Sequence, residues 1–223
     1  MPHKTTPKSL LNFKAVLFDM DGTLFNSEPL HFDALLEVVE LPSDFDWHPF
    51  LGMPDNLVLK TLFPEAAPQE IIQLILRKNE KLIEMINNKT LSEFQAMLTP
   101  GVYEFLTYLK TKSIPMALVT ASEGVITEAL LTKLELKHFF HGIYPREATA
   151  RTKPSASPYL KAMRDLNVSS LECLIFEDSP TGLQAALEAS AFVMKVTAHQ
   201  IPDSKSSFTD LQSTDQFFWL ISP

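Results

Sequence analysis

The sequence predicts an α/β fold, a doubly wound parallel sheet with a helical domain inserted after its first strand. Two patterns indicate this class. Short apolar runs bounded by turn-forming residues alternate with helical patterns over most of the chain, which is typical of a parallel sheet covered on both faces. The segment 29–96 shows helical periodicity alone and interrupts that alternation.

The sheet is expected to contain five strands, because five segments are short, apolar and bounded by breakers. They are residues 15–18, 116–120, 142–144, 171–176 and 192–196. Helical patterns of fitting length lie between the later strands, at residues 102–112, 125–134, 158–166 and 183–189. Ser157 is the candidate N-cap of the third of these helices. Right-handed crossovers then place helices on both faces of the sheet.

The inserted segment is expected to form a separate helical cap. Its helical patterns cover residues 29–39, 56–62 and 70–86, and prolines separate them. We therefore predict a discontinuous α/β core domain at 13–28 and 97–223, a cap domain at 29–96, and an N-terminal tail at 1–12. The aromatic run 217–220 is expected to pack on the core as an end cap.

Composition limits the possible partners and location. The formal net charge of −8 argues against nucleic acid or an anionic membrane surface as a partner, since both attract basic surfaces. The one cysteine, Cys173, lies in an apolar run and is expected to be a small core residue. Neither a signal peptide nor an apolar run of the ~20 residues needed for a membrane span is evident. We expect a cytoplasmic monomer.

Polar residues suited to metal and phosphate chemistry follow three predicted strands or precede a helix between them: Asp19 and Asp21, Thr120 and Ser122, Lys153, and Glu177 and Asp178. The carboxyl ends of parallel strands share one crevice, so these side chains should meet there. Clustered carboxylates need positive charge, and Mg²⁺ prefers oxygen ligands. The six histidines are scattered and the single cysteine lacks partners, which argues against zinc.

These motifs resemble those of the haloacid dehalogenase superfamily. The run from Asp19 to Thr23 resembles its DxDGT signature. Thr120 in ALVTAS, Lys153 in TKPSASPYL and the Glu177–Asp178 pair in IFEDSPTGLQAA resemble the other three motifs, in order. The resemblance covers about residues 14–196. The helical insert is similar to the cap of the subfamily I branch that contains β-phosphoglucomutase and many small-metabolite phosphatases.

The resemblance implies a role for each matching residue. Asp19 would be the nucleophile and Asp21 the general acid–base, with Thr120 and Lys153 completing the catalytic set. The implied cofactor is Mg²⁺, and its implied ligands are Asp19, Asp21 through its backbone carbonyl, Glu177 and Asp178. The implied binding residues for phosphate and substrate are Gly22, Thr23, Ala121, Ser122, His31 and Lys78.

For two of the cap residues, an ordinary position on a solvent-exposed helix is an alternative to a role in the site. His31 matches a histidine that positions the acid–base in β-phosphoglucomutase, but a solvated helix histidine fits the pattern equally well. Lys78 also matches a position in that enzyme, whereas its setting in RKNEK is typical of the solvent-exposed face of an amphipathic helix.

The expected activity is a Mg²⁺-dependent phosphomonoester hydrolase that acts on a small phosphorylated metabolite through an aspartyl-phosphate. Asp21 favours phosphate chemistry over dehalogenation. A phosphosugar mutase is the first alternative, but Asp55 stands where the mutase has an arginine for a second phosphate group. A non-catalytic metabolite-binding protein with this fold is the other alternative.

Overall fold

The computed structural model describes residues 13–42, 44–50 and 53–196. Its sheet has five strands in the order β3-β2-β1-β4-β5, and each neighbouring pair is parallel. The strands are β1 (Ala15–Phe18), β2 (Met116–Val119), β3 (Gly142–Tyr144), β4 (Cys173–Glu177) and β5 (Phe192–Lys195). Because β1 lies at the centre, the loop that follows it opens at the middle of the sheet edge.

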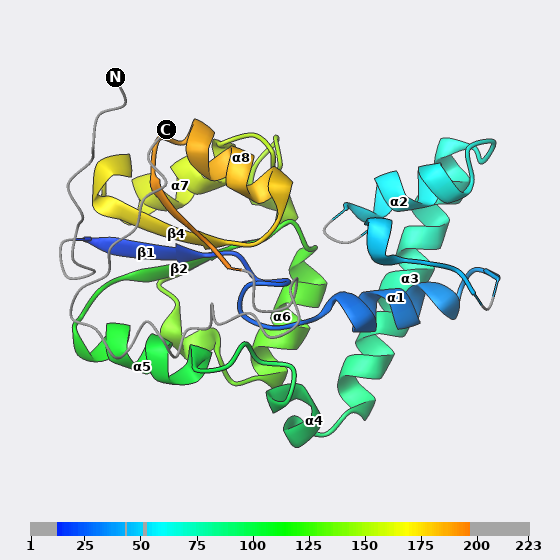
Figure 1. The fold of residues 1–223 in the computed structure, drawn as a ribbon, viewed down its shortest axis with the longest axis horizontal. Helices are drawn as coiled ribbons and strands as arrows, with labels where there is room; N and C mark the ends of the chain where they lie inside the picture. Colours follow the sequence, from blue (N-terminus) through cyan, green and yellow to red (C-terminus); the bar gives the residue numbers. More distant parts are fainter. Residues whose placement is uncertain (1–12, 43, 51–52, 197–223) are drawn as a thin grey trace.

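Helices cover both faces of the sheet, which confirms the predicted fold class (Figure 1). The helices on one face are α5 (Val102–Thr111) and α6 (Gly124–Lys133), and those on the other are α7 (Ser157–Asp165) and α8 (Pro180–Glu188). Side chains alternate along β1 between these faces, with Val16 and Phe18 on the first and Ala15 and Leu17 on the second. Both sets are fully buried, so the strand reads as one continuous apolar run.

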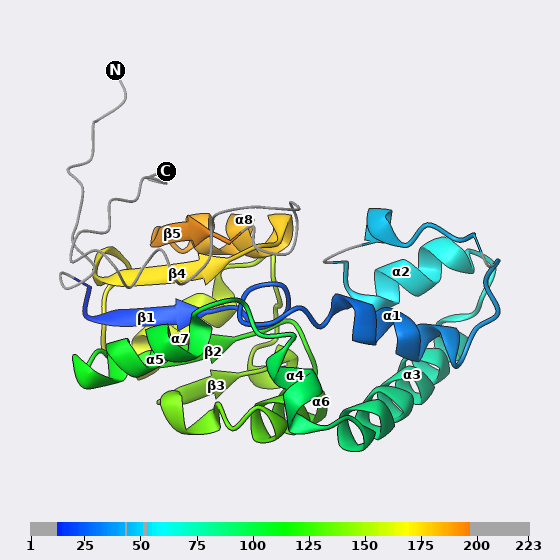
Figure 2. The same ribbon diagram turned by 60° about the horizontal axis from the view of Figure 1, so that its bottom comes forward.

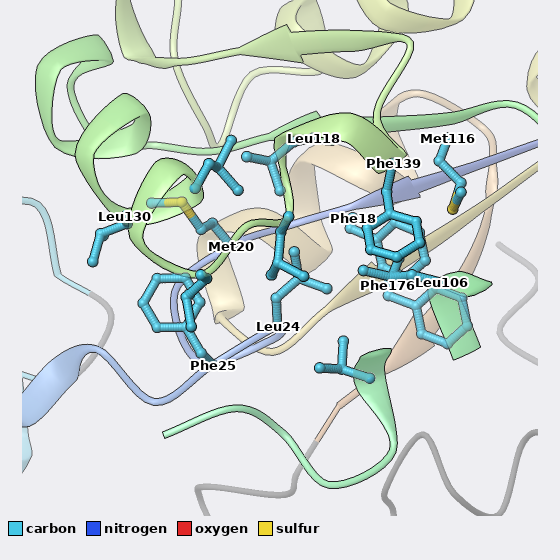
Figure 3. Close-up of a cluster of buried hydrophobic side chains, with 14 of the residues drawn as sticks. Phe18, Met20, Leu24, Phe25, Leu106, Met116, Leu118, Leu130, Phe139 and Phe176 are labelled. Atoms are coloured by element: carbon cyan, nitrogen blue, oxygen red, sulfur yellow. The ribbon is translucent and has the colours of Figure 1, made fainter. Parts of the chain in front are cut away.

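Aromatic and aliphatic side chains together fill the core between the sheet, α5 and α6 (Figure 3). Phe18 stacks on Phe176 with ring centroids 5.1 Å apart, and Phe105 meets both rings edge-on. Burial of such large apolar surfaces is the main stabilising term in a core of this kind. The same cluster continues into Leu82 and Ile86 of the cap, so the base of the cap is anchored in the core.

The cap lies beyond the carboxyl ends of the strands (Figure 2). Its helices are α1 (Glu28–Leu36), α2 (Asp55–Leu62), α3 (Pro68–Asn88) and α4 (Leu91–Gln95), with a 3-10 turn at His48–Phe50. α3 packs against α1, α2 and the core helix α6. The cap also has an apolar cluster of its own, formed by Leu35, Val39, Val58, Leu59 and Ile71.

Several predicted boundaries were wrong, and local hydrogen bonding explains them. β4 begins at Cys173 rather than 171, because Ser170–Glu172 form a 3-10 turn with Glu172 hydrogen-bonded to Ser169. α4 was not predicted, although Thr90 and Glu93 form the capping box that begins it. α7 begins at Ser157 itself, so this serine is not its N-cap.

Other predictions have simpler outcomes. Cys173 is buried in the core, as expected. No helix in the described part of the chain combines the length and apolar character that a membrane crossing requires. The proposed domain limits stay predictions, and the run 217–220 lies outside the described residues.

Candidate active site

Three buried carboxylates meet at the carboxyl ends of β1 and β4. Each of Asp19, Glu177 and Asp178 offers an oxygen, and these oxygens lie within 4.8 Å of one another. The strand register produces this meeting: Phe18 pairs with Phe176, and the Asp19 amide donates to the Phe176 carbonyl at 2.9 Å. Adjacent parallel strands thus bring acids that are far apart in sequence to one point.

Lys153 lies between two of these acids. Its ammonium nitrogen is 2.6 Å from Oδ1 of Asp19 and 2.6 Å from Oε1 of Glu177, and its side chain is buried. Burial opposes the charged form of Lys153, but Asp19 and Glu177 hold its pKa well above the usual value. Burial raises the pKa of Asp19 well above its usual value, and the neighbouring carboxylates add to this effect while Lys153 opposes it.

The donor set fits a divalent cation. Three carboxylates and one ammonium leave two negative charges, which is the charge that one Mg²⁺ ion would neutralise. The cluster is also closely enclosed. A Cβ on Gly22, whose φ is +81°, would lie 2.2 Å from Oδ2 of Asp178, so only glycine fits there. Thr23 donates its hydroxyl to Oδ1 of Asp178 at 3.1 Å.

Glu177 has further partners that the sequence pattern did not single out. Oε1 accepts a hydrogen bond from the Tyr159 hydroxyl at 3.2 Å, and Oε2 accepts from the amide and hydroxyl of Ser179 at 2.9 and 3.1 Å. Tyr159 is fully buried on α7, with its ring 5.0 Å from the Lys153 nitrogen. The sequence could have identified Tyr159 as a partner of the site, because it lies on the apolar face of a predicted helix and a buried hydroxyl needs a hydrogen-bond partner.

Hydroxyl groups surround the carboxylate of Asp21. Oδ2 accepts from Ser122 at 2.6 Å and from Thr120 at 3.3 Å, and Oδ1 accepts from Ser27. Burial opposes ionisation, but His31 and the two serines outweigh it and lower the pKa of Asp21 to about 2. Asp21 is therefore held as a carboxylate, and it is not a member of the group formed by Asp19, Glu177 and Asp178 among the described residues.

A chain of polar contacts connects Asp21 to the cap. His31 Nε2 lies 3.7 Å from Oδ1 of Asp21, and His31 Nδ1 lies 2.8 Å from the Lys78 nitrogen. Lys78 also donates to Oδ2 of Asp55 at 2.7 Å. When Lys78 donates to Nδ1, a neutral imidazole carries its proton on Nε2, the nitrogen that faces Asp21.

Lys78 is not on a solvent-exposed helix face. Its side chain is buried, and its nitrogen contacts His31 and Asp55 instead of the surface of the cleft. The structure thus pairs Asp55 with a lysine of the same cap.

A cleft of about 300 Å³ separates the core rim from the cap. Six of the sequence-predicted residues on the core side and one on the cap side line it: Asp19, Asp21, Thr120, Ala121, Ser122, Lys153 and His31. Glu177 and Asp178 lie behind this surface with Gly22 and Thr23, while Lys78 lies behind the cap wall. The cleft therefore has a charged, hydroxyl-rich floor and a separate cap wall.

Comparison with known proteins agrees with this geometry. A phosphatase of phosphorylated carbohydrates from Thermotoga maritima is 29% identical over 197 residues, covering 86% of this chain and 89% of the relative. The β-phosphoglucomutase of Bacillus subtilis is 28% identical over 196 residues, covering 82% of this chain and 83% of the relative. The crystal structure of a haloacid dehalogenase (HAD) hydrolase, family IA, from Entamoeba histolytica matches with a TM-score of 0.75 at 23% identity, covering 88% of this chain and 94% of that one.

The family model of the haloacid dehalogenase-like hydrolases matches residues 16–196. This range includes all four motifs and every strand residue of the sheet except Ala15. The family expected from those motifs is therefore confirmed. With its five-stranded parallel core and inserted helical cap, the chain belongs to the haloacid dehalogenase-like hydrolases.

Proposed function

We propose that the protein is a Mg²⁺-dependent phosphomonoester hydrolase that acts on a small phosphorylated metabolite. The observation that carries this proposal is the convergence of Asp19 and Lys153, on the floor of a cleft, with Glu177 and Asp178 directly behind them; Asp21 lines the same floor. This arrangement supplies a nucleophile, a fixed cation, a cation-binding set and a separate carboxylate for proton transfer. The relatives support the same reaction class, since a phosphatase is among them.

Asp19 would attack the phosphorus and become phosphorylated, and water would then release the phosphate. Lys153 holds one oxygen of Asp19 at 2.6 Å, which leaves the other oxygen for the attack. Mg²⁺, held by Asp19, Glu177, Asp178 and the backbone carbonyl of Asp21, would supply positive charge to the phosphoryl oxygens. The ammonium of Lys153 adds to that charge from the protein side.

Asp21 would transfer the protons. It would protonate the leaving oxygen in the first step and take a proton from the attacking water in the second. Its present partners are the hydroxyls of Thr120 and Ser122, which are also suitable donors to a phosphoryl group. A bound phosphoryl group would compete for these hydroxyls, and its negative charge would favour protonation of Asp21. His31 would steady the other oxygen of that carboxylate from the cap.

A hydrolase fits the cleft better than a mutase. A mutase must hold a second phosphate group, which needs a cation free to bind it. Of the lysines and arginines among the described residues that line the cleft, Lys153 contacts Asp19, and Arg146 contacts Glu123 at 3.1 Å. The complete set of motif residues also argues against a protein that only binds metabolites.

The test uses the purified full-length protein and a panel of phosphorylated metabolites. We expect phosphate release that requires Mg²⁺ and stops on chelation. The substitution Asp19→Asn removes the nucleophile, so it should lower kcat by about 10³-fold or more. Asp33→Asn makes the same chemical change on the exposed side of α1 and serves as the control. It should retain the wild-type kcat within about twofold, as surface substitutions generally do.

Two results would overturn the proposal. Undiminished phosphate release by the Asp19→Asn variant would exclude Asp19 as the nucleophile. Interconversion of sugar phosphate isomers that depends on a bisphosphate activator, without net phosphate release, would identify a mutase instead.

A further inference from the structure

The cap wall of the cleft carries four aromatic side chains, Phe32, Phe45, Trp47 and Phe50, which we call the aromatic shelf. Phe32 stacks on Trp47 with ring centroids 5.3 Å apart and on Phe45 at 6.0 Å, and Phe45 stacks on Phe50 at 5.7 Å. Phe32 belongs to α1, whereas the other three lie in the connection between α1 and α2. Two separate parts of the cap therefore form one aromatic surface that faces the catalytic floor.

Packing of the cap accounts for only part of the aromatic shelf. Phe32 and Phe50 pack against the apolar cluster of the cap, which contains buried residues such as Leu59, whereas Phe45 and Trp47 lie outside that cluster. The four aromatic residues are only half-buried, and all four line the cleft. Apolar surface left open in a concave site is typical of a ligand contact, because a ligand can cover it.

The charges on the cap wall are already matched. Asp55, which also lines the cleft, is paired with Lys78, and Arg146 of the core domain is paired with Glu123. A leaving group with its own negative charge would thus find no unpaired cation among the described residues of the cleft. The charged end of the substrate belongs at Lys153, and its uncharged end belongs at the aromatic shelf.

We infer that the leaving group of the substrate is an uncharged alcohol that carries a flat aromatic ring, and that this ring stacks on the aromatic shelf. This inference rests on the proposed phosphomonoester hydrolysis. A ring covers the shelf without losing hydrogen bonds, and stacked aromatic pairs gain free energy beyond their buried area. A polyol placed there would lose the hydrogen bonds that its hydroxyls make with water, because aromatic carbon atoms cannot replace them.

The experiment compares substrates that release alcohols of similar reactivity. Benzyl phosphate, hexose 6-phosphate and glycerol 3-phosphate are all esters of primary alcohols, so differences in kcat/KM report mainly how the leaving group is bound. With saturating Mg²⁺ and the full chain, we expect kcat/KM for benzyl phosphate to exceed that of the other two by about tenfold or more. Equal or higher kcat/KM for the two polyol esters would overturn the inference.

Variants of the aromatic shelf test the same point. Trp47→Leu should lower kcat/KM for benzyl phosphate by about tenfold and change that for glycerol 3-phosphate by less than about twofold. Tyr103→Leu, which removes a half-exposed aromatic residue from α5 in the core domain, is the matched control and should change neither. If Trp47→Leu does not fold, Phe45→Leu provides the second variant. An equal decrease in kcat/KM for both substrates would show that the aromatic shelf does not bind the aromatic ring selectively.

A binding measurement separates this inference from the proposed function. Benzylphosphonate and ethylphosphonate cannot be hydrolysed, and calorimetry gives their Kd values with Mg²⁺ present whether or not the protein has turnover. We expect the Kd of benzylphosphonate to be about tenfold lower than that of ethylphosphonate. Equal Kd values would overturn the aromatic specificity even if phosphatase activity were found. The expected ratio without any phosphate release would support the ring site and contradict the proposed function.

Discussion

At the scale of single residues, close approach of backbone to a carboxylate shapes the cluster of acids behind the floor of the cleft. Gly182, in the first turn of α8, lies directly against Glu177. A Cβ at this position would be 1.6 Å from Oε1 of Glu177, which is far inside van der Waals contact. Glycine is therefore required here for space rather than for an unusual backbone angle. The position of Glu177 in turn determines where Lys153 lies.

Gly182→Ala should destabilise the protein and displace Glu177 from Lys153. We expect the free energy of unfolding to fall by about 2–4 kcal/mol, because backbone and a fully buried carboxylate must both move. Gly124→Ala is the matched control, since its added Cβ would meet nothing closer than 3.6 Å. Urea unfolding of both variants measures the difference. Equal stability of the two variants would contradict the close contact at Gly182.

At the scale of helices and strands, a chain of polar contacts connects the cap helices to Asp21 on the floor of the cleft. Asp55 begins α2, Lys78 lies within α3, and His31 lies on α1 beside Asp21. Three cap helices are thus held together at the point where the cap meets Asp21. Helix periodicity alone could not place Lys78 there, because RKNEK has the composition of a solvated face.

Lys78→Met should therefore weaken both the cap and catalysis. It leaves Asp55 without its cation and His31 without a donor at Nδ1, so we expect a loss of about 1–3 kcal/mol in stability and a several-fold lower kcat. Lys81→Met removes a lysine of the same helix that pairs with Glu84 at the surface, and it should change stability by less than about 0.5 kcal/mol. Thermal unfolding and steady-state kinetics measure both effects. Similar behaviour of the two variants would show that the buried contacts add nothing.

At the scale of the whole molecule, an excess of negative charge is concentrated where core strands meet the cleft. The chain has a formal net charge of −8, and three buried carboxylates share one lysine at this point. A cation that binds only the folded state would stabilise the entire fold, because folding brings the ligands together.

Mg²⁺ should raise the Tm of the protein. At a concentration of 100 times Kd, linkage predicts about 2.7 kcal/mol of added stability. Asp178→Asn should abolish this gain, whereas Asp165→Asn, which changes an exposed acid on α7, should retain it. Thermal unfolding with Mg²⁺ and with a chelator measures the shift without any activity assay. The same Tm under both conditions would contradict a metal site at the three carboxylates.

The amino-acid sequence alone determined the fold class, the strands and the edge of the sheet where the acids gather. Apolar runs that end in Asp19 and in Glu177 and Asp178 are local features, and parallel strands necessarily bring their carboxyl ends together. The short helix α4 was not predicted, because a side-chain capping box rather than periodicity begins it.

Only the tertiary structure decided which cap residues face the site. It buried Lys78 against Asp55, placed Tyr159 on Glu177, and brought Trp47 and Phe32 together on one wall of the cleft. A helical pattern specifies that a residue lies on an apolar or polar face, but not which neighbour that face meets. That choice depends on packing between elements distant in sequence, and in this protein it forms the surface that we propose selects the substrate.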